Sequence, residues 1–195
     1  MNERGENIKL KKAYDNLLMI SMFSVVMLFA GLTSAYIVSM KGLGAKWDLI
    51  SLPTMFYLST LMIMTSSYFA QSSIKYCKNN NLALLSKGLL ITIFFGFLFF
   101  LFQILGWSSL VNENKFLSGN NVSASFLYIL TGLHFVHVIG GMISLVFMYV
   151  KSLQYKYTSK SFHGLQLGVR FWHFLGLLWI YLFLFLVLIK FLVNI

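Results

Sequence analysis

Charged residues are scarce in this sequence. They make up 10% of its 195 residues, whereas hydrophobic residues make up 58%. Soluble domains carry roughly 25% charged residues. Because so thin a polar coat would not cover this much apolar surface in water, we expect the chain to lie in a lipid bilayer.

Cysteine and proline are almost absent. The single cysteine, Cys77, excludes an internal disulfide and any zinc or iron–sulfur site built on paired cysteines. The single proline, Pro53, stands at the start of an apolar segment, where its missing N–H costs a helix nothing. No apolar segment is interrupted by proline, which argues against a transporter with discontinuous membrane helices.

Acidic residues are also few, and none lies in the middle of an apolar segment. The five are Glu3, Glu6, Asp15, Asp48 and Glu113. Ionisable groups are kept inside a membrane mainly for proton relay or transport, because burying them is costly. Their absence disfavours a proton pump or ion-coupled carrier that works alone.

Five apolar segments are each long enough to cross a bilayer. About 20 mostly apolar residues form a helix that spans the hydrocarbon layer of roughly 30 Å. The segments are residues 17–40, 52–73, 88–107, 125–150 and 167–193, and residues 1–16 form a polar tail before them. The sequence therefore predicts an all-α membrane bundle of five transmembrane helices, in a single domain over residues 1–195.

Basic residues give the chain a formal net charge of +10 and lie mostly between the apolar segments. That position fits anionic lipid headgroups, and we expect no nucleic-acid partner. One side of the membrane would receive Arg4, Lys9, Lys11, Lys12, Lys75, Lys78, Lys87, Lys151, Lys156, Lys160 and Arg170, and the other only Lys41, Lys46, Lys115 and Lys190. Because Lys and Arg favour the cytoplasmic side, the N-terminus is predicted to be cytoplasmic and the C-terminus external, or periplasmic.

Histidines inside the apolar segments are the candidates for a functional site. His134 and His137 lie three residues apart in the fourth segment and so project from one face of a helix. His173 lies near the start of the fifth segment. Three interpretations are open: a metal site, a haem held by two histidines, and structural packing.

The residues themselves favour packing. No carboxylate or thiolate stands at a matching depth to complete a metal shell around His134, His137 and His173. A b-type haem would pair one of the first two with His173, but at about 1.5 Å per residue their depths differ by several ångströms. Gly132 and Gly140 flank the histidine pair, and such small residues let helix backbones approach closely.

The fourth and fifth segments resemble one known family. The stretch TGLHFVHVIGG at 131–141, a basic connection from Lys151, and RFWHFLGLLW at 170–179 are similar to subunit III of haem–copper cytochrome c and quinol oxidases. That family shows T-G-x-H-x-x-H-V-x-x-G, then a W-H-F triplet with a tryptophan five residues beyond the phenylalanine. Trp172, His173 and Trp179 match that spacing. The plan of five segments resembles the short bacterial form of the family.

Two departures from the family pattern concern acidic residues. Family members commonly carry a glutamate after a serine in the first shared helix, where this chain has Val25 after Ser24. A Q-x-x-E pattern in the third shared helix begins here with Gln103 and ends with Gly106. Any role that needs those carboxylates does not carry over.

The resemblance implies an accessory subunit of a respiratory oxidase in a bacterial inner (plasma) membrane, without a catalytic centre of its own. Haem and copper would belong to its partners, the catalytic subunit I and the copper-bearing subunit II. The subunit would stabilise subunit I, bind phospholipid and support proton uptake. The residues expected to pack or to contact lipid are His134, His137, Lys151, Trp172 and His173.

The electron donor, the lipid and membership of a respiratory supercomplex are not decided by this sequence. Cytochrome c is the favoured donor over quinol. Two other functions stay open: a small b-type haem protein that uses His134 or His137 with His173, and a lipid-binding or transport bundle without an oxidase partner.

Overall fold

The structure is a computed structural model that describes residues 3–44, 47, 50–117, 121–158 and 161–193. The connection residues Lys46, Asp48 and Lys160, which entered the predictions from charge, lie outside the described residues. The same holds for the side chains of Glu3 and Glu6 and of Arg4 between them.

Five helices make up nearly all of the described chain. They are α1 (Glu3–Leu43), α2 (Thr54–Lys78), α3 (Leu82–Asn112), α4 (Val122–Leu153) and α5 (His163–Val193). The prediction of an all-helical fold with five helices is confirmed. The helices extend beyond most of the predicted bounds, because apolar residues mark only the part of a helix suited to lipid. The polar tail before residue 17 is itself the beginning of α1.

Four of the helices, α1, α3, α4 and α5, are long and apolar enough to cross a membrane. The predicted second span, α2, does not reach that level in the described residues. It carries serines along its buried face, at Ser59, Ser66 and Ser73. These side chains lower its hydropathy while pointing into the bundle.

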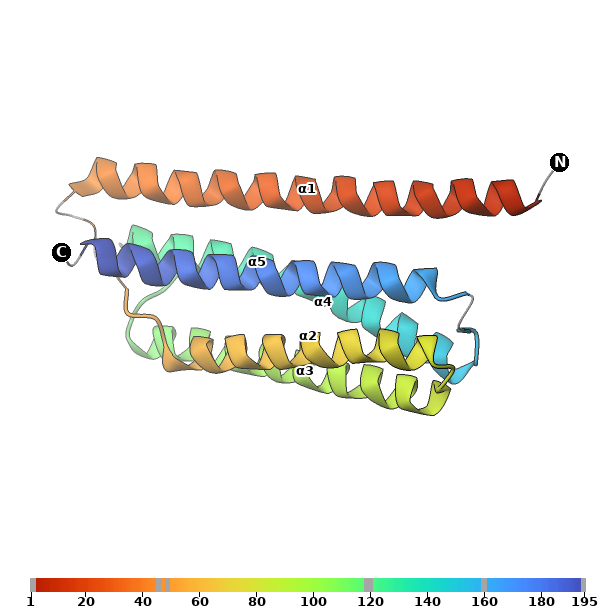
Figure 1. Cartoon of the computed structure of the whole chain (residues 1–195). Coiled ribbons are helices and arrows are strands. Elements are labelled where there is room, and N and C mark those ends of the chain that lie inside the picture. The colour runs from red at the N-terminus through yellow and green to blue at the C-terminus, as the bar shows by residue number, and fades with distance from the viewer. Residues whose placement is uncertain (1–2, 45–46, 48–49, 118–120, 159–160, 194–195) are drawn as a thin grey trace.

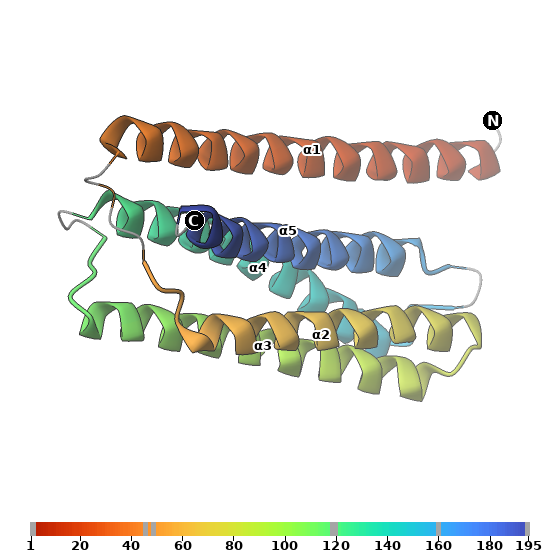
Figure 2. The same cartoon turned by 60° about the vertical axis from the view of Figure 1, so that its left-hand side comes forward.

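Helices α2 to α5 form a four-helix bundle, and α1 lies outside it (Figures 1 and 2). Each bundle helix packs against two others, in the order α2, α3, α4, α5 and back to α2. Helix α1 contacts α4 and α5 and makes no contact with α2 or α3. Consecutive helices run in opposite directions, so α1, α3 and α5 all begin at one end of the bundle.

Asparagine side chains cap the N-termini of two helices. Asn81 accepts a hydrogen bond from the backbone N–H of Leu84 at the start of α3, at 3.2 Å, and Asn121 accepts one from Ala124 at the start of α4, at the same distance. Such caps satisfy backbone donors that the first turn leaves free. Each cap therefore fixes where its helix begins.

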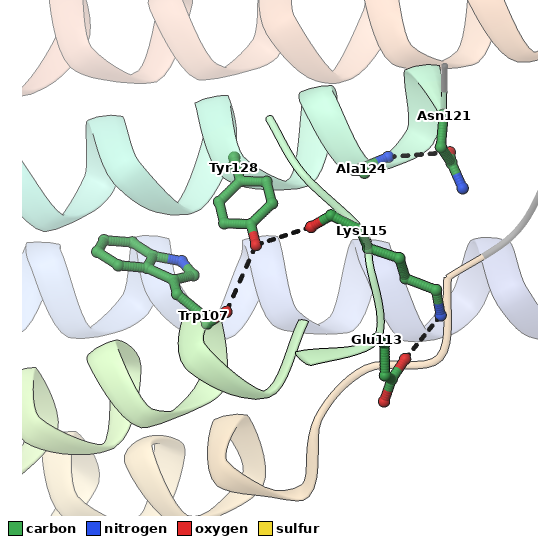
Figure 3. Close-up of polar contacts among 6 residues, drawn as sticks. All are labelled: Trp107, Glu113, Lys115, Asn121, Ala124 and Tyr128. Carbon is green, nitrogen blue, oxygen red and sulfur yellow. Dashed lines mark hydrogen bonds and ion pairs between the residues drawn. The ribbon is translucent and has the colours of Figure 1, made fainter. Parts of the chain in front are cut away.

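The connection between α3 and α4 is held onto α4 by Tyr128 (Figure 3). The hydroxyl of Tyr128 lies 3.0 Å from the carbonyl oxygen of Lys115 and 3.4 Å from that of Trp107. Beside it, Lys115 Nζ forms an ion pair of 2.8 Å with Glu113. Glu113 thus lies just beyond the end of α3, as its place in the sequence predicted.

Candidate functional site

His134 lies at the centre of the molecule and is fully buried. Three aromatic rings surround its imidazole, one each from α1, α3 and α5. Ring centres lie 6.3 Å away at Phe29, 6.1 Å at Phe99 and 5.3 Å at Trp179. Neither ring nitrogen has a hydrogen-bond partner in the described part of the chain. His134 is therefore enclosed in an aromatic pocket.

His137 lies one turn along the same face but has a different environment. Its Nδ1 lies 2.7 Å from the carbonyl oxygen of Leu133, on its own helix. Its ring packs edge-on against Phe29, with 5.7 Å between ring centres. The two histidines thus share a contact with α1, and His137 remains half-buried.

His173 lies on a different side of the bundle from His134. Its Nε2 is 3.2 Å from Oε1 of Gln71 on α2. Along α5 it precedes Trp179, the residue against which His134 packs, by six positions, or about 9 Å at 1.5 Å per residue. The predicted offset in depth is therefore present, and the structure does not bring the two imidazoles together as haem ligands.

A metal site is likewise not assembled from these side chains. Among the described residues, no group of three or more His, Cys, Asp and Glu side chains lies close enough to hold a metal ion. The three membrane histidines instead contact phenylalanine, tryptophan and glutamine.

Trp172 is fully buried and joins three helices. Its Nε1 donates to the hydroxyl of Ser66 at 3.1 Å, and that hydroxyl donates to the carbonyl oxygen of Thr92 at 2.9 Å. Room for the indole comes from two glycines, since a Cβ at Gly96 or at Gly141 would lie only 3.1 Å from it. The indole has no free face on which a quinone could stack.

Hydrogen bonds from tryptophan to hydroxyl groups recur elsewhere in the bundle. Trp107 donates to Thr131 at 3.0 Å, and Trp179 donates to Thr60 at 2.9 Å. Thr60, Ser66 and Thr131 were not among the residues predicted from sequence. The available signal was the presence of serine and threonine within apolar segments, since a buried indole N–H usually finds a polar partner.

Lys151 lies exposed at the end of α4, beside a surface hollow of about 420 Å³. Apolar side chains form much of the hollow, including Ile143, Phe147 and Met148, and Lys151 and Tyr157 also line it. Burial, with a further effect of the nearby Cys77 thiol, raises the pKa of Tyr157 to about 12. The Tyr157 hydroxyl therefore keeps its proton at neutral pH.

Gly106 and Val25 stand where members of the family in the sequence comparison commonly carry an acidic residue. Their surroundings differ. Gly106 is buried, and a Cβ there would overlap the ring of Phe56 on α2. The phenyl ring thus takes up the space that a side chain would need. Val25 is half-buried on α1 and packs against the apolar core.

Comparison with known proteins gives the family of this chain. A sequence profile of the family described as cytochrome c oxidase subunit III matches residues 5–190, nearly the whole chain. The chain belongs to this family. The resemblance drawn from the histidine and tryptophan motifs is confirmed.

Individual relatives carry the same description. A probable cytochrome c oxidase subunit 3 of Nocardia farcinica is 30% identical over 169 residues, which cover 84% of this chain and 82% of the relative. The corresponding protein of Mycobacterium leprae is 26% identical over 162 residues, covering 82% and 80%. Human cytochrome c oxidase subunit 3 is 29% identical over 169 residues, covering 82% of this chain and 63% of the human protein.

Family membership makes this chain an accessory subunit of a haem–copper oxidase. Haem and copper are carried by the catalytic subunits, and the subunit III family has no cofactor of its own. The alternative of a small b-type haem protein is not supported. A transport bundle without an oxidase partner would also not account for a match over residues 5–190.

Proposed function

We propose that this subunit III is a five-span scaffold that stabilises catalytic subunit I beside the copper-bearing subunit II, binds phospholipid and supports proton uptake. The match to the family over nearly the whole chain is the observation that carries this proposal. Relatives from Nocardia and Mycobacterium support a bacterial inner membrane as its location. All five helices form one membrane domain in this proposal.

Helix α2 is proposed as the fifth span on the basis of its place in the bundle. Its 25 residues would be about 37 Å long at 1.5 Å per residue, which exceeds the hydrocarbon layer. It runs alongside α3 and α5 and shares the core with them. Its buried hydroxyls are paired within the bundle, as Ser66 is with Trp172. Its polarity is therefore compatible with a position inside the membrane.

The end of the bundle where α1, α3 and α5 begin is assigned to the cytoplasm. Most of the basic residues lie there, which is the pattern that the positive-inside rule describes. At this end Asp15 of α1 forms an ion pair of 3.0 Å with Arg170 of α5, and His163 lies 3.5 Å from the same carboxylate. This cluster of charged and polar side chains joins α1 to α5 at the end of the bundle that is proposed to face the cytoplasm, the side from which the oxidase would take up protons.

The hollow beside Lys151 is proposed as a phospholipid site. Its apolar wall suits an acyl chain, while the ammonium group of Lys151 suits a phosphate. A cation at the cytoplasmic end of a membrane helix also complements the negative end of the helix dipole. His134, His137 and Trp172 are then packing groups within the bundle, and His173 is bonded to Gln71 where α5 meets α2.

Purification of the tagged chain from its native membrane tests the function. We expect it to carry with it large subunits that show haem and copper spectra. An oxidase prepared without this chain should keep those spectra but lose activity sooner during sustained turnover. Isolation of the chain as a lone bundle, or loss of haem from the oxidase that lacks it, would contradict the proposal.

Reporter fusions test the topology. A cytoplasmic reporter placed in the α2–α3 connection just after Lys78 should be active, and the same reporter placed near Lys115 in the α3–α4 connection should be inactive. The reverse pattern would overturn the orientation. Activity at both places would show that α3 does not cross the membrane.

A further inference from the structure

The outward surface of α2 is more polar than the outward surfaces of α3 and α4. On α3 and α4, every exposed residue within the predicted spans is apolar, as at Leu90, Phe97, Val136 and Phe147. On α2, the exposed residues include Thr54, Tyr57, Tyr68 and Gln71. Lipid chains suit the first kind of surface, whereas the second offers them polar groups that they cannot solvate.

Four polar groups cluster on this surface, where α2 meets α5. They belong to Ser67, Tyr68, Gln71 and His173, and are called here the α2–α5 polar patch. The amide oxygen of Gln71 pairs with Nε2 of His173. Among the described residues, the Ser67 and Tyr68 hydroxyls, the Gln71 amide nitrogen and His173 Nδ1 form no hydrogen bond.

Two outward hydroxyls of α2 near the patch are bonded within the helix. Thr65 and Ser72 each donate to the carbonyl oxygen four residues earlier, at 2.8 and 3.0 Å. Serine and threonine in membrane helices commonly form this bond. The groups of the α2–α5 polar patch differ from these two hydroxyls, since they have donors and acceptors that no described residue uses.

The patch lies within the membrane depth. Tyr68 precedes Lys75, the basic residue expected at the cytoplasmic interface, by seven positions, or about 10 Å along the helix. At that depth an unpaired hydrogen-bonding group is costly in lipid, and polar side chains in membrane helices are usually paired with protein. Helix α1 does not supply the partner, since it makes no contact with α2.

A hollow of about 320 Å³ lies next to the patch, between α2 and α5. Met64, Leu177 and Ile180 give it an apolar wall, and Ser67 and His173 give it polar groups. Such a mixed lining suits a side chain with an apolar body and a polar end.

We propose that the α2–α5 polar patch docks a transmembrane helix of another subunit of the oxidase. That helix would present hydrogen-bonding side chains to Ser67, Tyr68, Gln71 and His173, and would place one side chain in the adjacent hollow. The inference rests on the proposed function, which supplies the partner subunits. It accounts for the polar residues on the outer surface of α2, because a helix covered by protein on its outer side does not need an apolar surface.

Photo-crosslinking in the whole oxidase tests the docking site. A photoreactive phenylalanine analogue replaces Tyr68 in one preparation and Phe147 of α4 in the other. The two residues are exposed by 69% and 64%. They also lie at similar depth, five positions before Ser73 and Ser152, which both pack near the start of α3, against Gly88 and Ser86. We expect an adduct with a larger membrane subunit at position 68, several-fold more abundant than at position 147.

The outcomes separate the two proposals. If haem-bearing subunits co-purify but position 68 reacts only with lipid, or with a second copy of this chain, the docking site is wrong and the proposed function stands. If no oxidase subunit co-purifies with the unmodified chain, the proposed function itself fails.

A pair of variants gives an independent readout. The double variant Ser67→Ala, Gln71→Leu should lower the fraction of this chain retained by the oxidase in detergent several-fold. Thr65→Val, which removes a hydroxyl bonded within α2, should leave that fraction unchanged. Equal retention in both variants would overturn the docking site even if an adduct forms.

Discussion

The imidazole of His134 packs against the indole of Trp179, with 5.3 Å between ring centres and 31° between ring planes. Both residues belong to the motifs by which the family was identified, one on α4 and the other on α5. Their contact shows that the motifs mark a packed junction between two helices. Because neither nitrogen of His134 is hydrogen-bonded to a described residue, the shape of the imidazole is what fits this pocket.

Replacing His134 by leucine should leave the oxidase as stable as before or more stable. An unpaired buried polar group carries a desolvation penalty of about 1–3 kcal/mol, and an apolar side chain of similar size removes it. His134→Ala should instead destabilise the subunit by about 2–4 kcal/mol, because it leaves a cavity among Phe29, Phe99 and Trp179. Thermal release of this subunit from the purified oxidase measures both effects.

The haem spectrum of the same preparations serves as the control for ligation. It should be identical in the unmodified oxidase, in His134→Leu and in His137→Ala. A lost or shifted haem band in either variant would show that the imidazole is a ligand and would contradict the packing role.

The helices were predictable from sequence because each contains a long and mostly apolar stretch, which in α1, α3, α4 and α5 is enough to cross a membrane. Their ends were not, since hydropathy stops at the lipid boundary while backbone hydrogen bonds continue through polar residues. The caps Asn81 and Asn121 were the available signals for two of these ends. Helix α1 continues back to Glu3, through residues that were predicted as a polar tail.

The candidate site was predictable only in part. The separation of His173 from His134 followed from counting residues along two antiparallel helices. The aromatic pocket did not, because Phe29 reaches His134 only when α1 packs on α4 and α5. The hydroxyl partners of the tryptophans were also missed, since many serines and threonines were available and only the packing selects among them.

Gly106 should not tolerate even an alanine. A methyl group at this position overlaps the ring of Phe56, and overpacking of this kind costs about 1–3 kcal/mol. Gly132 of α4 is the matched control, because nothing lies within 4 Å of a Cβ at that position. Gly106→Ala should therefore lower the temperature at which the subunit leaves the oxidase, and Gly132→Ala should not.

A second substitution tests whether the Phe56 ring is the cause. Adding Phe56→Leu to Gly106→Ala should restore part of the lost stability, since it removes the atoms that the new methyl group meets. If the double variant is no more stable than Gly106→Ala, steric overlap with Phe56 is not the reason for glycine at this position.

Reversing the charge of Lys151 should release anionic phospholipid. The hollow beside it would then present a carboxylate to the lipid phosphate, and repulsion would replace attraction. Lys156→Glu is the matched control, because Lys156 is exposed in the same connection and does not line the hollow. Native mass spectrometry of the oxidase should count fewer bound anionic lipids for Lys151→Glu only. An unchanged count would refute this lipid site.

Removing the hydroxyl of Ser66 should loosen the contact between α2, α3 and α5. Ser66→Ala leaves the N–H of Trp172 and the carbonyl oxygen of Thr92 without their present partner. Interhelical hydrogen bonds in membrane proteins contribute about 0.6 kcal/mol each on average, so the loss of two should cost about 1 kcal/mol. The temperature at which the subunit leaves the heated oxidase measures the change.

Thr65→Val is the control for Ser66→Ala, because the Thr65 hydroxyl bonds only within α2 and lies on its outer side. A double-mutant cycle with Trp172→Phe then isolates the bond between the indole and Ser66. If that bond joins α5 to α2, Ser66→Ala should cost less in the Trp172→Phe background, where only the bond to Thr92 remains to be lost. Equal costs in both backgrounds would show that the indole N–H contributes nothing to holding these helices together.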